Sequence, residues 1–253
     1  MKIRTLVQDC IYLNWALPAE ALLPPPAPLR YELHLHEGVS YAFVSALLFR
    51  QHGMRLASVP MPRFYHPQAN LRVYVTDDEG VPGVLFERML VPAWVVPGGW
   101  IAGQPLAPAR FEFPEAGALS PDGPWHWSVS ASGELEVEAR RASPGVGEGP
   151  RFANWETAVS YFRHRNRGYC DGPWGLKRID TEHPRVTCHP VAADVTKNGL
   201  LVDCFGGEPW PALHSAFLCP EIPLDFELST AGAEAQQRRA PAVAADPAMP
   251  ILL

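Results

Sequence analysis

The chain has 253 residues, of which 47% are hydrophobic and 19% charged, and its formal net charge at pH 7 is −6. This composition is typical of a folded soluble protein, and a negative chain provides no attractive field for nucleic acid or for an anionic membrane. We therefore expect neither a nucleic-acid partner nor a membrane partner. The 28 prolines are about double the usual ~5% share, which favours many short elements joined by rigid connections.

The sequence also lacks the common signals of export and of cofactor chemistry. It has no basic start followed by an apolar run and no apolar stretch of about 18 residues, so we expect a cytoplasmic protein. No nucleophile-elbow, zincin or phosphate-loop motif occurs, so we expect no cofactor. The five cysteines are widely spaced without a Cys-x-x-Cys pair and are interpreted as reduced, mostly buried thiols, without a metal site. They are Cys10, Cys170, Cys188, Cys204 and Cys219.

The first third of the chain predicts strands and one long loop. Residues 10–15 read as a strand, and residues 29–36 alternate between apolar and polar side chains before a turn at Glu37 and Gly38. Residues 39–49 then return as a mostly apolar strand, which completes a hairpin. Residues 50–67 are interrupted by prolines and predict an ordered loop.

Two histidines lie on the first of these strands. His34 and His36 share a strand face, a spacing that metal sites use, but no third ligand follows at a diagnostic distance. We therefore expect both histidines to face solvent, opposite an inward face formed by Leu33 and Leu35.

The central hairpin, within residues 70–100, carries the clearest two-faced strand. Leu71, Val73 and Val75 alternate with Arg72, Tyr74 and Thr76, so one face is apolar and the other can carry chemistry. Residues 77–80 supply a turn, and residues 84–91 predict the return strand. Pairing charge with charge predicts that Arg72 lies opposite Glu87 and that Val73 lies opposite Phe86.

The second half predicts further strands and one helix. Residues 92–105 suit a sharply bent segment, and residues 125–129 and 135–139 form a third hairpin. Asn154 is a good N-cap for a helix through Arg163. Further strands are expected at residues 109–113, 169–179, 185–195, 200–205 and 216–228, two of them joined by a tight turn at Asn198-Gly199. We predict one domain over residues 1–228 and a disordered Ala/Pro-rich tail over residues 229–253.

Several segments resemble a known family. The opening LNWALPAEALLPPPAPLRYELHLHEGVSYAFVSALLFR, the central NLRVYV and the return GVPGVLFE are similar to the YqjF-like family of uncharacterised conserved bacterial proteins. TAVSYFRHRNRGY and EHPRVTCHP resemble its C-terminal elements more weakly. The resemblance implies a mainly β protein with the acetoacetate decarboxylase-like fold, a curved antiparallel β-barrel closed or cone-shaped around a cavity, with one or two short helices packed outside.

The resemblance also bears on one kind of chemistry. The characterised relative decarboxylates a β-keto acid through a Schiff base on a lysine that a neighbouring cation activates. Its Phe-Pro-Lys-Lys motif resembles Val96-Pro97-Gly98-Gly99 here, and glycine cannot form an imine. The chain's lysines are only Lys2, Lys177 and Lys197. Lysine-based decarboxylation is therefore not expected, and the sequence leaves open whether the protein is an enzyme.

The remaining candidate site lies on the central hairpin. A guanidinium at Arg72 in a partly dry cavity would bind a carboxylate through two hydrogen bonds, and Glu87 would serve as an acid or base if burial raised its pKa. Asn70, Tyr74 and Arg50 could join the same cavity as ligand-binding residues. The competing interpretation is an inward salt bridge between Arg72 and Glu87 that only satisfies two buried charges.

Three functions remain open. The first is a binding barrel for a small organic acid or amphipathic metabolite, anchored at Arg72. The second is a lyase or isomerase that works without a Schiff base and uses Glu87. The third is a structural or interaction module with a filled interior, and exposed sheet edges leave a homo-oligomer possible. An open cavity of about 300–1,000 Å³ would favour the first two.

Overall fold

The computed structural model describes residues 2–57, 62–115, 124–144, 149–172, 175–182, 184–207 and 209–229. Strands dominate this part of the chain, and no helix in it is long and apolar enough to cross a membrane. The strands are β1 (Lys2–Pro18), β2 (Arg30–Tyr31), β3 (Leu33–His36), β4 (Val39–Leu56), β5 (Phe64–Thr76), β6 (Pro82–Val91), β7 (Leu106–Pro108), β8 (Arg110–Glu112), β9 (Trp125–Ser130), β10 (Glu134–Arg141), β11 (Arg167–Gly172), β12 (Gly175–Glu182), β13 (His189–Lys197) and β14 (Ser215–Ser229). The helices are η1 (Ala19–Ala21), α1 (Val96–Ile101), α2 (Trp155–Arg163) and α3 (Gly199–Phe205).

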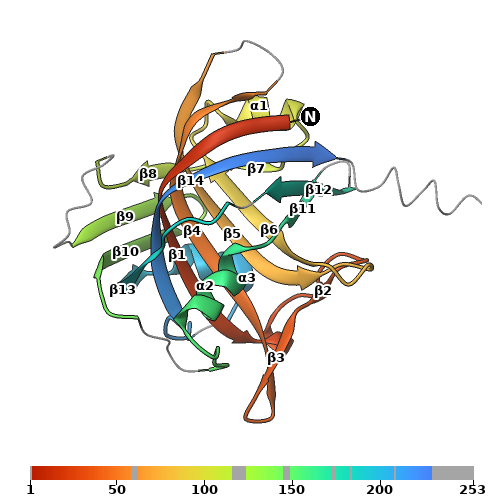
Figure 1. Ribbon diagram of the computed structural model, residues 1–253, viewed down its shortest axis with the longest axis vertical. Coiled ribbons are helices and arrows are strands. Elements are labelled where there is room, and N and C mark those ends of the chain that lie inside the picture. The colour runs from red at the N-terminus through yellow and green to blue at the C-terminus, as the bar shows by residue number, and fades with distance from the viewer. Residues whose placement is uncertain are drawn as a thin grey trace, which may run out of the picture.

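The central strands pair into a closed ring. The order runs β1, β4, β5, β6, β11, β12 and β14, and β14 pairs back onto β1. Every pairing in the ring is antiparallel except that between β6 and β11, and the strands curve strongly (Figure 1). A second arm leaves the ring at β14 and continues through β13, β10, β9 and β8. The predicted mainly β, ring-forming architecture is confirmed.

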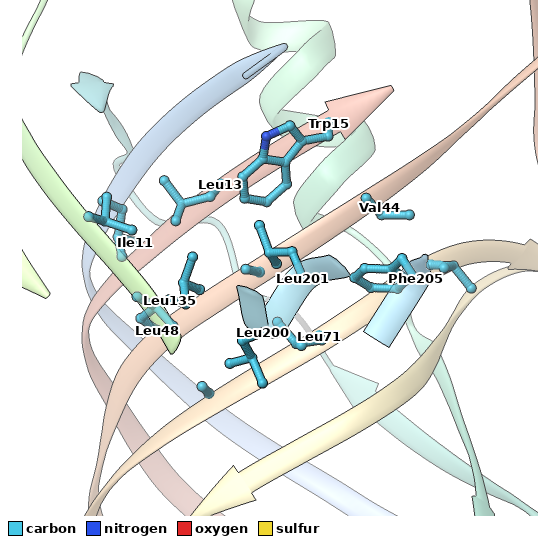
Figure 2. Packing of buried hydrophobic residues seen from close by; sticks show 14 of the residues in the cluster. Ile11, Leu13, Trp15, Val44, Leu48, Leu71, Leu135, Leu200, Leu201 and Phe205 are labelled. Atoms are coloured by element: carbon cyan, nitrogen blue, oxygen red, sulfur yellow. The ribbon is translucent and has the colours of Figure 1, made fainter. Parts of the chain in front are cut away.

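One face of the ring packs against this second arm. The apolar residues of β1, β4 and β5 meet α3 and the β9–β10 hairpin in a large hydrophobic core, part of which is shown in Figure 2. Leu13 and Leu71 from the ring and Leu200 from α3 are all fully buried there. The apolar face predicted for β5 therefore packs on the outside of the ring, and its polar face is turned inward.

The inner face of the ring is closed at one end by α2. Ala158 and Phe162 of this helix pack with Phe43, Tyr74 and Phe217 from the strands. The helix begins as predicted, because the Asn154 side chain accepts a hydrogen bond from the Thr157 amide at 2.8 Å. The position of α2 over the interior differs from the outside packing that the family resemblance implies.

Two local predictions are wrong. The proline-interrupted segment 50–67 is mostly strand, because β4 continues to Leu56 and β5 starts at Phe64. Residues 200–205 form helix α3, with Asn198 at its N-terminal boundary instead of in a tight turn. The segment 92–105 is not a strand, as predicted, and the short helix α1 accounts for part of its bend. The predicted tail lies, from residue 230 onward, outside the described residues.

The faces of β3 are also the reverse of those expected. Leu33 and Leu35 are 55% and 76% exposed, whereas His34 is half-buried. The His34 ring packs against Phe43 and Tyr161, and its Nε2 atom lies 2.9 Å from the Tyr161 hydroxyl. The histidine face of β3, and not its leucine face, therefore packs against the aromatic cluster beneath the strand.

The cysteines do not all remain thiols. Cys188 and Cys219 are joined by a disulfide, which corrects the expectation of reduced cysteines at these two positions. Cys10 and Cys170 are buried free thiols, and Cys204 is partly buried. The prediction failed because 31 residues separate the bonded pair, and only the pairing of distant strands brings them together.

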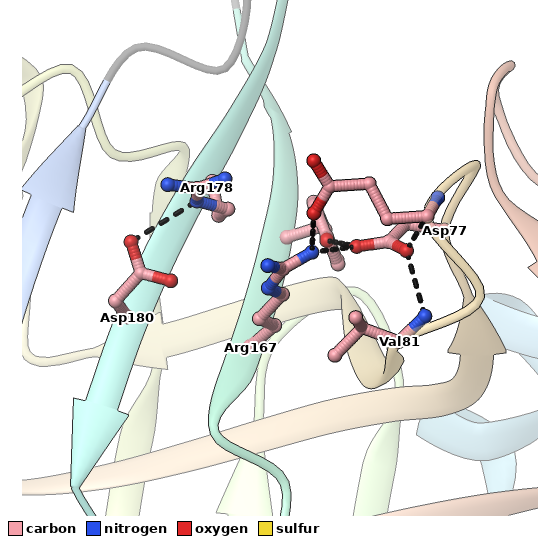
Figure 3. Close-up of polar contacts among 7 residues, drawn as sticks. Asp77, Val81, Arg167, Arg178 and Asp180 are labelled. Carbon is pink, nitrogen blue, oxygen red and sulfur yellow. Dashed lines mark hydrogen bonds and ion pairs between the residues drawn. The ribbon is translucent and has the colours of Figure 1, made fainter.

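A polar network fixes the turn between β5 and β6. Asp77 accepts hydrogen bonds from the Val81 amide at 2.9 Å and from the Tyr169 hydroxyl at 2.7 Å, and it also pairs with Arg167 (Figure 3). Burial alone would raise the pKa of Asp77, but these hydrogen bonds outweigh it and the pKa is lowered. The network ties the hairpin turn to β11 and so helps to set the cavity wall.

Candidate functional site

The ring encloses a cavity of about 320 Å³, within the range usual for ligand pockets. Its wall is mostly apolar and is built by the inner faces of the ring strands together with α1. Polar side chains gather on one strand, β5, where alternate residues face the cavity: His66, Gln68, Asn70 and Arg72. The predicted two-faced character of β5 places this polar row inside the ring.

Arg72 is the central residue of the site. Its side chain lines the cavity, and the residue is only 5% exposed. Its Nη2 atom donates to the Phe162 carbonyl at 2.6 Å and to the Tyr74 hydroxyl at 3.1 Å. The guanidinium carbon lies 5.4 Å from the ring centres of both Tyr12 and Tyr74. Two aromatic rings and a helix carbonyl thus hold the guanidinium in place.

The charge of Arg72 has no partner within the described part of the chain. No carboxylate there lies within 4.0 Å of its nitrogens, and its buried Nε atom has no hydrogen-bond acceptor among the described residues. An arginine remains protonated in proteins, and a buried charge without a partner is costly. The site therefore carries a buried positive charge that no carboxylate of the described residues neutralises.

A second arginine in the same wall contrasts with the first. Arg165, in the connection between α2 and β11, also lines the cavity, but its Nη1 atom pairs with Glu32 at 3.0 Å. Its guanidinium also lies over the Tyr161 ring, 4.1 Å from the ring centre. Sequence reasoning missed Arg165, because nothing in its local pattern shows that the parallel pairing of β6 with β11 brings it to this cavity.

A chain of amide groups leads along the wall toward Arg72. Thr5 donates to Oε1 of Gln51 at 2.6 Å, Gln51 donates to Oε1 of Gln68 at 3.3 Å, and Gln68 donates to Oδ1 of Asn70 at 2.8 Å. Each amide oxygen is therefore occupied. The Nδ2 group of Asn70 ends the chain as a donor, two residues before Arg72 on the same strand face.

Two further polar atoms lie in the wall without a partner among the described residues. They are Nε2 of Gln104 and Nε2 of His66, and both are buried. The Cys170 thiol donates to Oε1 of Gln104, which leaves the amide nitrogen as the unused group. Burial lowers the pKa of His66, so its ring is neutral near pH 7, with Nδ1 beside the Pro67 carbonyl. Sequence reasoning did not identify Gln104 or His66.

The prediction that Arg72 lies opposite Glu87 is wrong. Arg72 pairs with Phe86, and Leu71 pairs with Arg88, so Glu87 is the extra residue of a β-bulge. Glu87 is exposed and does not line the cavity. The inward Arg72–Glu87 salt bridge therefore does not form.

Of the other predicted site residues, one lines the cavity and two do not. Asn70 lines the cavity, as described above. Tyr74 is fully buried behind Arg72, where its hydroxyl donates to the Phe162 carbonyl at 3.1 Å. Arg50 lies outside the cavity wall and pairs with Asp9 at 3.4 Å. Only Asn70 and Arg72 are thus brought into the cavity together.

The glycines that stand where the resemblance places lysines do line the cavity. Gly98 and Gly99 belong to α1, at the opposite part of the wall from α2. Among the described residues that line the cavity there is no lysine, no aspartate and no glutamate. The wall therefore offers amide and guanidinium donors, and it offers neither an amine to form an imine nor a carboxylate to move a proton.

Comparison with solved structures supports the fold. The enduracididine biosynthesis enzyme MppR with HEPES buffer bound superposes with a TM-score of 0.54 at 12% identity, over 90% of this chain and 87% of that chain. An acetoacetate decarboxylase from Legionella pneumophila subsp. pneumophila superposes with a TM-score of 0.52 at 14% identity, over 91% and 86%. At these identities the likeness concerns the fold alone, which is acetoacetate decarboxylase-like.

Sequence comparison identifies the family. Among curated proteins, none matches the chain. A model of the DUF2071 family, described as uncharacterised conserved proteins, matches residues 5–223. This range begins within β1 and ends within β14, so it includes every strand of the ring. The chain therefore belongs to the DUF2071 family of uncharacterised conserved proteins.

Proposed function

We propose that the protein binds a small organic acid in its cavity and that Arg72 holds the carboxylate. The observation that carries the proposal is the buried guanidinium of Arg72, which lines the cavity with an unpartnered Nε atom and no carboxylate within 4.0 Å in the described part of the chain. An anion placed beside this group would supply the missing charge. A guanidinium and a carboxylate form two parallel hydrogen bonds, the strongest common recognition of this anion.

The balance of charge in the wall supports an anionic ligand. Arg165 is already paired with Glu32, so the charge of Arg72 is the one that a ligand can neutralise. The amide nitrogen of Gln104, which has no partner among the described residues, and the amide group of Asn70 line the same cavity and would donate to further oxygen atoms of a ligand. A site for a cation would require carboxylates, which the described wall lacks.

The other open functions receive less support from the geometry. A filled interaction module is at odds with a cavity of about 320 Å³. A lyase or isomerase that depends on Glu87 would need this carboxylate in the cavity, and Glu87 is exposed outside it. The MppR structures hold HEPES or the condensation product of pyruvate and imidazole 4-carboxaldehyde. Of these properties, we propose only small-molecule binding for the present protein.

The test is a binding screen with matched acids and variants. Short carboxylic acids and their uncharged amides are added to the wild type, and the melting temperature and heat of binding are measured. We expect the acids to stabilise the wild type and the amides to have little effect. Arg72→Met should reduce acid affinity at least about tenfold, the loss of one charge-assisted contact. Arg50→Ala is the control, since Arg50 lies outside the wall.

Two results would contradict the proposal. One is that no acid raises the melting temperature at any attainable concentration. The other is that acids stabilise wild type and Arg72→Met equally, which would place their binding elsewhere. Circular dichroism spectra of each variant establish that a lost response does not come from unfolding.

A further inference from the structure

The cavity changes in character along its length. On β5, the cavity-facing residue Phe64 is 37% exposed, whereas His66 and Arg72 are each 5% exposed. Eight residues separate Phe64 from Arg72, or about 26 Å of strand. The cavity is therefore open to solvent near the start of β5 and closed near Arg72, where α2 covers the ring.

The open end is apolar. Besides Phe64 it includes Trp94, which is 58% exposed, the exposed Gly98, and the partly exposed Ile3 and Met54. No described residue of this end that lines the cavity carries a charge. A ligand would therefore pass an apolar entrance before it reached the buried guanidinium. Only the end of the ligand that enters first would reach Arg72, so a charged group is expected at that end alone.

We propose, as an inference that rests on the proposed function, that the ligand is an amphipathic monocarboxylate. Its carboxylate reaches Arg72 first, and its unbranched apolar chain lies along the cavity toward α1. Met89, Val84 and Phe86 of β6 and Leu224 of β14 supply apolar contacts along this path. A second carboxylate at the far end of the ligand would lie among described residues that carry no charge, so the same geometry disfavours dicarboxylates.

The proposal makes a quantitative statement about chain length. Each methylene group that leaves water for an apolar wall is expected to tighten binding about fourfold. Affinity should therefore rise from acetate through butyrate and octanoate to dodecanoate. A ligand held only by its carboxylate would show no such dependence.

Calorimetric titration of the full-length protein with a matched set of probes tests this statement. The series acetate, butyrate, octanoate and dodecanoate measures chain length. Suberate has the chain length of octanoate with a carboxylate at both ends, and octanol has its tail without the charge. We expect octanoate to bind at least about tenfold more tightly than suberate or octanol.

One variant tests the position of the chain. A Cβ atom at Gly98 meets nothing within 4 Å, so Gly98→Leu fills open space at the entrance without disturbing the backbone. At Gly99 the same atom would collide with Leu106, so that position is unsuitable. We expect Gly98→Leu to weaken the binding of dodecanoate, the longest probe, and to leave the binding of butyrate unchanged. Ile101→Ala is the control, because Ile101 is 89% exposed and does not line the cavity.

The outcomes separate this inference from the proposed function. Equal affinities for butyrate, octanoate and suberate, all lost in Arg72→Met, would leave the acid site intact and overturn the apolar-chain inference. Binding of octanol as tight as that of octanoate, unaffected by Arg72→Met, would overturn both. Affinity that rises with chain length, is lost in Arg72→Met and is weakened for dodecanoate by Gly98→Leu would support both.

Discussion

The Phe162 carbonyl, in the last turn of α2, accepts hydrogen bonds from Arg72 at 2.6 Å and from the Tyr74 hydroxyl at 3.1 Å. The last carbonyls of a helix have no partner within the helix, so such donors satisfy them. Because the Tyr74 hydroxyl also donates to this carbonyl, the carbonyl would keep a hydrogen-bond donor without Arg72. The contact explains how the guanidinium is positioned, and it leaves the Nε atom without an acceptor among the described residues.

This double contact predicts the stability of an Arg72 variant. Arg72→Met keeps the apolar stem, removes an unpaired buried charge and leaves the Tyr74 hydroxyl on Phe162. We expect the free energy of unfolding without ligand to fall by no more than about 1 kcal/mol, or to rise. Urea denaturation followed by circular dichroism measures it. A loss of about 3 kcal/mol or more would instead assign Arg72 a mainly structural role.

The Asp77 network predicts a second, pH-dependent effect. Asp77→Ala should lower the free energy of unfolding by about 2–3 kcal/mol at neutral pH, because it removes buried hydrogen bonds to a charged group. The pKa of Asp77 is lowered in the folded state. Its contribution is therefore present above the unfolded pKa, about 3.9, and is lost as the pH falls through the folded value.

Denaturation curves of wild type and Asp77→Ala at several pH values should thus converge in acid. Glu79→Ala is the matched control, because Glu79 also pairs with Arg167, at 2.7 Å, but its side chain is 46% exposed. An exposed pair of this kind contributes at most about 1 kcal/mol. A constant difference between wild type and Asp77→Ala down to about pH 2 would contradict the lowered pKa.

Three wholly or partly buried histidines predict a loss of stability in mild acid. Burial lowers the pKa of His34, His66 and His214. The unfolded chain then binds more protons than the folded chain below the unfolded pKa of about 6.5, so stability is lost as the pH falls from there. Each histidine contributes a slope of at most about 1.4 kcal/mol per pH unit. Urea denaturation at about pH 7.5 and about pH 5.5 measures the change.

The contribution of His66, the histidine that lines the cavity, can be measured separately from those of His34 and His214. His66→Gln should reduce this pH dependence while it keeps a polar side chain in the wall. His36→Gln is the comparison, since His36 lies on the same strand face as His34 and is only partly buried. Identical pH dependence in wild type and His66→Gln would show that His66 does not contribute.

The cysteines predict a definite pattern of chemical modification. Alkylation of the unfolded, unreduced protein should label Cys10, Cys170 and Cys204, and prior reduction should add Cys188 and Cys219. In the native protein these three thiols should react slowly, because burial raises the pKa of Cys170 to about 11 and that of Cys204 to about 12, and raises that of Cys10 further. Mass spectrometry counts the labels.

The disulfide also predicts a change in stability. Cys188→Ser, or reduction, should lower the free energy of unfolding by about 2–4 kcal/mol, the usual effect of opening a loop of this size. Cys204→Ser is the control, because Cys204 takes no part in the bond. Labelling of all five cysteines without reductant would show that the bond does not form in solution.

The sequence predicted what local patterns can specify. The alternation in residues 71–76 identified a two-faced strand, and Asn70 and Arg72 on its polar face do line the cavity. Asn154 identified the start of α2, because an N-cap acts within one turn. The family resemblance predicted the ring. Each of these follows from residues close together in the chain or from a recognisable motif.

Only the tertiary structure decided which residues meet across the ring. A single bulge moved Glu87 out of register with Arg72, and a shift of one residue turns a side chain to the opposite face. The aromatic cluster under β3 turned His34 inward. Arg165 reached the cavity through the parallel pairing of β6 with β11. These outcomes depend on packing between distant segments, and for that reason the unpaired charge of Arg72 could be recognised only in the folded protein.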